Sequence, residues 1–82
     1  MLLNLHITFA DKTEKTVTAI AADLVAFEEK FDMSVTRLDR EARLTHFMFL
    51  AYSVELRNKE TAKSFDEWLP TIESVELTDS KK

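Results

Sequence analysis

The segment that most restricts the fold is a strongly apolar stretch in the middle of the chain, about residues 40–57. Its apolar side chains recur at the three- and four-residue spacing of an α-helix, so we expect a helix there. They form two stripes on roughly opposite sides of that helix: Leu44, Phe47, Met48, Ala51 and Val54 on one, and Phe49, Tyr52 and Leu56 on the other. A helix that is apolar on both sides is normally buried on both sides. The rest of the chain, or another protein chain, must therefore cover each stripe.

The N-terminal segment, about residues 2–19, is predicted to be a β-hairpin. Leu3, Leu5, Ile7 and Phe9 alternate with polar residues, which is the period of a half-buried strand. Residues 11–14 form a polar break, and residues 15–19 are rich in β-branched side chains that favour a returning strand. Because an isolated hairpin is marginally stable in water, its apolar face is expected to pack on the helices that follow.

The apolar period changes to that of a helix at Ile20, and we expect an amphipathic helix over about residues 20–31. Residues 32–36 are interpreted as a connection. Asp39 is expected to cap the central helix at its start. Asn58 is expected to cap that helix at its end in a left-handed conformation.

The motif Ser64-Phe65-Asp66-Glu67-Trp68-Leu69 predicts the start of a last helix. Ser64 and Glu67 have the spacing of a capping box, in which each side chain accepts from the backbone N–H of the other residue. Pro70 predicts a kink, after which helical structure is expected to continue to about Glu76. The predicted fold class is thus α+β and mostly helical, an N-terminal β-hairpin packed on about three α-helices. We expect one domain over residues 1–77 and a flexible tail over residues 78–82.

Composition argues against several classes of function. The 82 residues include no glycine, and the loops that cradle phosphate or dinucleotides need it. There is no cysteine, so neither disulfides nor thiolate metal sites are expected. The net charge of −4 argues against nucleic-acid binding, and no apolar run is long enough to span a membrane. A cytosolic protein without cofactors is the simplest expectation.

The residues also give no sign of an enzyme. His6 and His46, the two histidines, have no metal-ligand spacing and are expected at the surface. No serine lies between the glycines of a nucleophile elbow. The neighbouring carboxylates Glu28-Glu29 and Asp66-Glu67 diverge around their helices instead of converging on a substrate. We therefore expect no catalytic, metal-binding or cofactor-binding residues.

The apolar content indicates a protein-binding surface instead. Six apolar residues in a row, residues 47–52, together with Trp68 and Leu69, exceed what one small core readily hides. We expect Phe27, Phe31, Phe47 and Trp68 to build most of the core. The candidate residues for contacts with an oligomer partner or a client are Phe49, Tyr52, Leu56, Phe65 and Leu69. The arginines of residues 37–43 and the acidic C-terminal third are either a solvated surface or patches that attract each other between copies.

The order of these features resembles the small tail assembly chaperones of long-tailed bacteriophages, and is similar above all to those of phages that infect actinobacteria. The resemblance covers about Leu3 to Glu76. It is carried by the hairpin, by Asp23-x-x-x-Phe27-Glu28-x-x-Phe31, by the apolar helix, and by Ser64-Phe65-Asp66-Glu67-Trp68-Leu69 with Val75-Glu76.

This resemblance implies a non-enzymatic role in which the chain binds the tape measure protein, keeps it soluble and supports tail tube polymerisation around it. It also implies self-association into a homo-oligomer, a longer form made by ribosomal frameshifting, and a location in the host cytoplasm but not in the mature virion. Two alternatives stay open. One is a small acidic regulator or inhibitor, such as an antitoxin or a nucleic-acid mimic, and the other is a structural head–tail joining protein.

Overall fold

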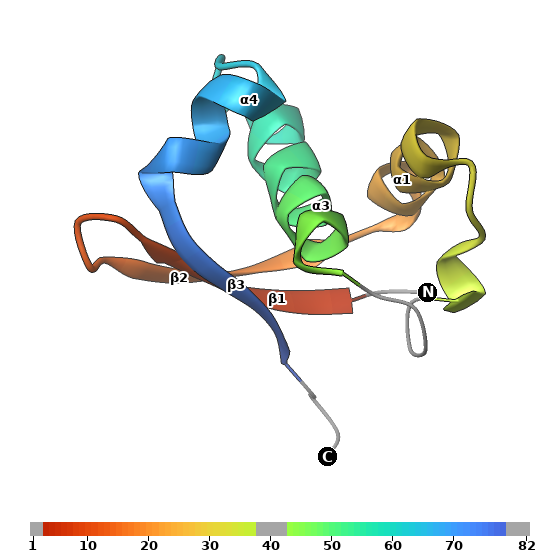
Figure 1. Ribbon diagram of the computed structural model, residues 1–82, viewed down its shortest axis with the longest axis horizontal. Helices are drawn as coiled ribbons and strands as arrows, with labels where there is room; N and C mark the ends of the chain where they lie inside the picture. Colours follow the sequence, from red (N-terminus) through yellow and green to blue (C-terminus); the bar gives the residue numbers. More distant parts are fainter. Residues whose placement is uncertain (1–2, 38–42, 79–82) are drawn as a thin grey trace.

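The computed structural model of the chain describes residues 3–37 and 43–78, and these contain a three-stranded antiparallel sheet (Figure 1). The strands β1 (Leu3–Phe9), β2 (Glu14–Ala19) and β3 (Ile72–Thr78) lie in the order β2-β1-β3. The central strand β1 pairs with both others, so Ile7 faces Lys15 on one side and Val75 on the other. Segments from the two ends of the chain therefore lie side by side.

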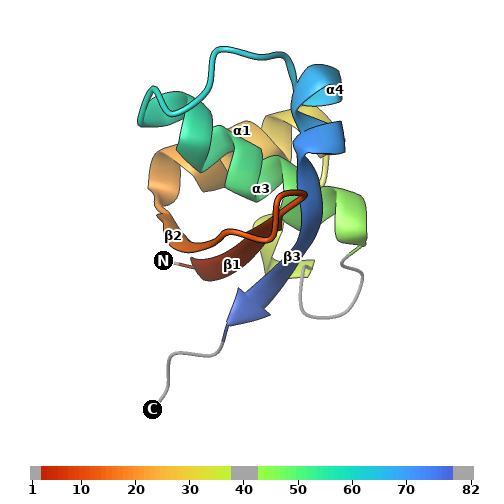
Figure 2. The same cartoon turned by 90° about the vertical axis from the view of Figure 1, so that its left-hand side faces the viewer.

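The helices cover one face of this sheet. The longer ones are α1 (Ala21–Phe31) and α3 (Leu44–Arg57), and the 3-10 turn η1 (Val35–Arg37) follows α1. The four-residue helix α4 (Phe65–Trp68) and the 3-10 turn η2 (Leu69–Thr71) lead into β3. Two views at right angles place α1, α3 and α4 on the same side of the sheet (Figures 1 and 2). The molecule thus has two layers.

The core lies between these two layers. Leu5 and Ile7 of β1 are fully buried in one hydrophobic cluster with Phe27 of α1 and with Leu50 and Val54 of α3. Burying side chains of this size contributes roughly 1.5–3 kcal/mol each. Trp68 of α4 is also buried, at 2% exposure, and it extends the core toward the start of β3.

The hairpin predicted from residue alternation is confirmed over the described residues, and it turns without glycine. Lys12 takes the left-handed conformation at the turn, with a φ of 76°. Its N–H donates to the carbonyl oxygen of Phe9 at 2.9 Å, and the N–H of Phe9 donates to the carbonyl oxygen of Thr13 at 2.8 Å. The carboxylate of Asp11 accepts from the N–H of Thr13 at 3.0 Å. These bonds offset the cost of a left-handed non-glycine residue, about 1–2 kcal/mol.

The fold class expected from the sequence, mostly helical with a hairpin on about three helices, is wrong. Residues 72–78 form β3 instead of the C-terminal part of a helix. Helix α4 ends at Trp68, and the chain passes through η2, which contains Pro70, before it becomes extended. Pro70 has no N–H to donate to another helical turn, whereas an extended segment pairs with β1 from Asn4 to Phe9. The protein is an α+β fold with a three-stranded antiparallel sheet.

The ends of the helices agree with the sequence in part. The capping box of α4 is confirmed: the N–H of Glu67 donates to Ser64 Oγ at 3.2 Å, and the N–H of Ser64 donates to Glu67 Oε1 at 3.1 Å. Asn58, in contrast, has a φ of −84° and is not left-handed. The left-handed residue after α3 is Lys59, with a φ of 62°.

The remaining expectations concern the start of the central helix and the C-terminal tail. Helix α3 begins at Leu44, and the preceding Arg43 has an extended backbone. The expected cap at Asp39 lies outside the described residues. Thr78, placed in the tail by the sequence, is the last residue of β3 and pairs with Asn4. Residues 79–82 lie outside the described part.

Candidate functional site

A continuous row of aromatic rings runs across the helical layer from α1 through α3 to α4. Phe31 lies edge-on to Phe49, with 5.6 Å between ring centroids, and Phe49 lies edge-on to Phe65 at the same centroid distance. Tyr52 then contacts Phe65 at 5.4 Å and Trp68 at 5.5 Å. Edge-on and tilted pairs at these distances are favoured by the charge distribution of the rings. We call these five residues the aromatic row.

Of the five candidate contact residues from the sequence, Phe49, Tyr52 and Phe65 belong to this row, and the five differ in exposure. Phe49, Phe65 and Leu69 are half-buried and pack against the core. Leu56 is 46% exposed, one helical turn beyond Tyr52. Tyr52 is buried, and its hydroxyl donates to the carbonyl oxygen of Lys63 at 2.6 Å. Tyr52 therefore ties α3 to the segment before α4, while the other four present apolar surface.

A lysine at the edge of the aromatic row was missed by the sequence reasoning. The Nζ atom of Lys30 lies 6.0 Å from the ring centroid of Phe49 and 5.8 Å from that of Phe65. At such distances an ammonium is attracted by the ring faces, which is worth about 0.5–1 kcal/mol at an exposed site. Lys30 follows α1's acidic Glu28 and Glu29, and nothing in that spacing indicates a contact with α3 and α4.

The four residues that the sequence predicted for the core also differ in exposure. Phe27 and Trp68 are buried as predicted, whereas Phe31 and Phe47 are only partly buried. Phe31 stands at the α1 end of the aromatic row. The exposed part of Phe31 therefore continues the apolar surface formed by Phe49 and Phe65.

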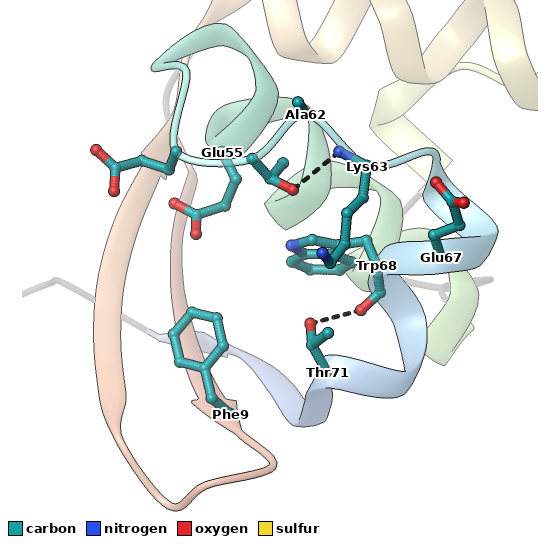
Figure 3. A pocket seen from close by; sticks show the side chains of 9 residues that line it. Phe9, Glu55, Ala62, Lys63, Glu67, Trp68 and Thr71 are labelled. Atoms are coloured by element: carbon teal, nitrogen blue, oxygen red, sulfur yellow. Dashed lines mark hydrogen bonds between the residues drawn. The ribbon is translucent and has the colours of Figure 1, made fainter.

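A pocket of about 530 Å³ lies beside the buried end of the row (Figure 3). Phe9, Glu55 and Trp68 point toward this hollow from three different elements, β1, α3 and α4. The side chain of Glu55 is 5% exposed, and its Oε2 accepts from Lys15 Nζ at 2.9 Å. Glu60 Oε1 lies 3.5 Å from the same nitrogen. One ammonium from the hairpin is therefore shared by two carboxylates from the end of α3 and the residues that follow.

The charged groups beside this pocket have a structural role and are not suited to acid–base chemistry. The hydrogen bond to Glu55 raises the pKa of Lys15 above its usual value, burial opposes this, and the charges of Glu55 and Glu60 add to the rise. Lys15 therefore stays protonated and is neither a base nor a nucleophile near neutral pH. In residues 3–37 and 43–78, no group of three or more histidine or carboxylate side chains is placed to hold a metal ion.

Both histidines make specific hydrogen bonds. His6 lies on the sheet face away from the helices, where Nε2 is 2.8 Å from Glu14 Oε1 and Nδ1 is 3.3 Å from Thr16 Oγ1. His46, expected at the surface, is instead 8% exposed. Its Nδ1 accepts from the N–H of Arg43 at 3.1 Å, so its ring takes the place that a glutamate holds in a capping box. The ring also packs edge-on against Phe31.

Asp23, the most deeply buried carboxylate of residues 3–37 and 43–78, is held by structural partners. Asp23 is 1% exposed and accepts from Arg57, from Ser53 Oγ at 2.7 Å and from the N–H of Ile20 at 2.9 Å. Burial acts to raise its pKa, but the hydrogen bond from Arg57, those from Ile20 and Ser53, and the charge of Arg57 outweigh burial. The pKa of Asp23 is therefore lowered, and the side chain is a charged link between α1 and α3.

Comparison with known proteins adds no family. No protein-family model, no curated protein and no solved structure matches the chain. Among the described residues, no helix has both the length and the apolar character needed to cross a membrane.

Proposed function

We propose that this protein is a non-catalytic binding module whose aromatic row receives an apolar helix of a partner protein. The observation that carries this proposal is the exposed side of the row. Phe49, Phe65 and Leu69 are half-buried, Leu56 is nearly half exposed, and Lys30 lies at the edge. Aromatic surface of this kind, with a charged rim, is enriched in protein interfaces.

The geometry supports recognition of a helix laid along the outer side of α3 and α4. Phe49 and Leu56 are seven residues apart on α3, so they lie two turns apart on the same side of that helix. A partner helix with apolar side chains at positions i, i+3 or i+4 and i+7 matches that spacing. The ammonium of Lys30 favours an acidic or aromatic residue at the edge of such a helix.

The resemblance named above suggests which partner this is. Under our proposal the chain is a phage tail assembly chaperone. It binds the tape measure protein in the host cytoplasm, keeps it soluble while the tail tube polymerises around it, and leaves before the virion is complete. The residues of α4 that carry the resemblance include Phe65 of the aromatic row. The same resemblance suggests a homo-oligomer and a longer frameshifted form. A long client that binds many copies gains affinity through avidity even where each contact is weak.

The test is co-expression with the tape measure protein and a comparison of two leucines on the same helix. Leu56→Asp places a charge beside the aromatic row, whereas Leu44→Asp places it at the other end of α3, where Leu44 is 59% exposed. We expect wild type and Leu44→Asp to keep the client soluble, and Leu56→Asp to bind it at least about tenfold more weakly, since an unpaired charge in an apolar contact costs more than 1 kcal/mol.

Circular dichroism of each variant alone checks that the fold is retained. The proposal fails if the client is equally soluble with and without this chain, or if both aspartates weaken binding equally. Mass spectrometry of purified virions separates a chaperone from a structural joining protein, because a joining protein remains in the particle.

A further inference from the structure

Within residues 3–37 and 43–78, the outer edge of β2 pairs with no other strand. In the order β2-β1-β3, β1 lies on one side of β2, and none of these residues forms a strand on its other side. The N–H of Phe9 donates to Thr13, which makes Phe9 and Thr13 a hydrogen-bonded pair at the end of the hairpin. Bonded and non-bonded pairs alternate along an antiparallel ladder. The next pair, Thr8 and Glu14, is therefore non-bonded, and the backbone groups of Glu14 point away from β1.

By the same alternation, the backbone groups of Thr16 and Thr18 also point outward. One contact supports this direction independently: Arg57 Nη2 donates to the carbonyl oxygen of Thr18 at 3.4 Å, from outside the ladder. The side chains of Glu14, Thr16 and Thr18 are all exposed. The edge thus offers outward backbone donors and acceptors at Glu14, Thr16 and Thr18, flanked by exposed polar side chains, and the carbonyl oxygen of Thr18 already accepts from Arg57.

Apart from the Arg57 side chain at the carbonyl oxygen of Thr18, the described residues give this edge none of the devices with which proteins protect a free strand. Lysine, proline and bulges commonly serve that purpose. β2 contains no proline and pairs with β1 in an unbroken register from Leu3↔Ala19 to Thr8↔Glu14. Its one lysine, Lys15, is drawn toward the helices by Glu55. The other edge differs, since β3 has an irregularity opposite Thr8 and Phe9.

We propose that β2 of a second copy of this chain pairs with this edge, antiparallel and centred on Thr16. In that register Thr16 faces the partner's Thr16, and Glu14 faces the partner's Thr18. Lys15 faces the partner's Val17. No like charges meet, and threonine pairs are favourable across strands. The contact is the same from both sides, so it closes as a two-fold dimer with one continuous six-stranded sheet.

This pairing does not rest on the client proposed above, because it uses the sheet edge and leaves the aromatic row uncovered. It also keeps the one carboxylate of β2 away from the new interface. Glu14 is held by His6 on its own chain at 2.8 Å, so its carboxylate is directed along the sheet face and not across the new interface. The carbonyl oxygen of Thr18 has a second lone pair in addition to the one used by Arg57.

Single cysteines test the register, because the chain has no cysteine of its own. In the proposed dimer the two Thr16 positions are about 5.5 Å apart between Cα atoms, within the range that a disulfide spans. The two Thr18 positions are four residues out of register and about 14 Å apart. Under mild oxidation of the purified chain without any client, we expect Thr16→Cys to form a disulfide-linked dimer at least about tenfold faster than Thr18→Cys.

Sedimentation equilibrium of the unmodified chain supplies the second measurement. We expect a concentration-dependent dimer, and a dissociation constant at least about tenfold higher for Thr16→Pro, which removes one outward N–H in each copy. The N–H of Thr16 makes no bond to β1 in this register, so the monomer's circular dichroism is expected to persist. A wild-type chain that stays monomeric at about 1 mM, or equal rates of cross-linking for the two cysteine variants, overturns the proposal.

Discussion

Asp23 joins two helices that are far apart in the sequence. Its carboxylate accepts from the backbone at the start of α1 and from Ser53 and Arg57 near the end of α3. A buried charge is tolerated only when its oxygen atoms are fully hydrogen-bonded. Removal of the carboxylate leaves the Arg57 guanidinium and the Ser53 hydroxyl without their acceptor, so the loss is larger than that of one surface ion pair.

We expect Asp23→Ala to lower the free energy of unfolding by about 2–3 kcal/mol. The matched control is Asp66→Ala, an exposed carboxylate on α4, where a change of less than about 0.5 kcal/mol is expected. Urea unfolding at neutral pH measures both. Equal effects of the two substitutions would show that the network around Asp23 contributes nothing beyond an ordinary surface carboxylate.

Asp23 also gives the stability a defined dependence on pH. Because its pKa is lowered in the folded state, its contribution is present above the unfolded pKa of about 3.9 and is lost as the pH falls through the folded pKa. We therefore expect the wild type to lose more stability than Asp23→Ala between about pH 5 and pH 2. Parallel losses in the two proteins would contradict the lowered pKa.

Single residues show why some contacts were not predictable. Lys12, Asp32 and Lys59 have left-handed backbones, but these residue types do not indicate that conformation in a sequence as glycine does. From the sequence, His46 is expected to be an exposed polar residue on a helix. It is buried instead, and its ring nitrogen accepts from the N–H of Arg43 just before the helix. The capping box at Ser64, in contrast, depends only on local spacing and was predictable.

At the scale of elements, β3 shows how a bulge interrupts the alternating pattern by which a strand is recognised in a sequence. Ile72 and Val75 are three residues apart, which is a helical spacing, and both are buried. They face the same core because the pairing with β1 skips Glu73 between Ile72 and Ser74. A bulge adds one residue and so breaks the period of two by which strands are recognised. The sequence therefore favoured a continued helix, whereas the regular hairpin and the two longer helices kept their periods and were predicted.

Two proline substitutions in β3 distinguish the strand from the helix. The alternation of the ladder makes Glu76 a bonded partner of His6, while the N–H of Leu77 points away from β1. We expect Glu76→Pro to cost about 2 kcal/mol or more and Leu77→Pro less than about 1 kcal/mol, because proline is tolerated where a strand's N–H faces outward. Thermal unfolding of the two variants provides the comparison, and a helix would be broken similarly by both.

At the scale of the whole molecule, the fold closes only when the two ends of the chain meet. β1 is the central strand, and its partners are the adjacent β2 and the distant β3. The helices between them pack on the same face, so the core contains residues from β1, β2, α1, α3, α4 and β3. Only the hairpin half of this sheet was visible in the sequence, because pairing between distant segments leaves no local pattern.

This closure predicts a single cooperative unfolding transition. Trp68 is the only tryptophan, and it is 2% exposed between α3 and the start of β3. Its fluorescence reports on the packing of α4, while circular dichroism reports mainly on α1 and α3. Because both depend on one shared core, we expect the two signals to give coincident urea transitions, with a slope of about 1 kcal/mol/M.

A chain that lacks residues 72–82 is expected to lose both signals together, since it loses Ile72, Val75 and the strand that pairs with β1. If the truncated chain keeps helical circular dichroism with an exposed Trp68, the helical layer is stable without β3 and the two-layer fold is not one cooperative unit.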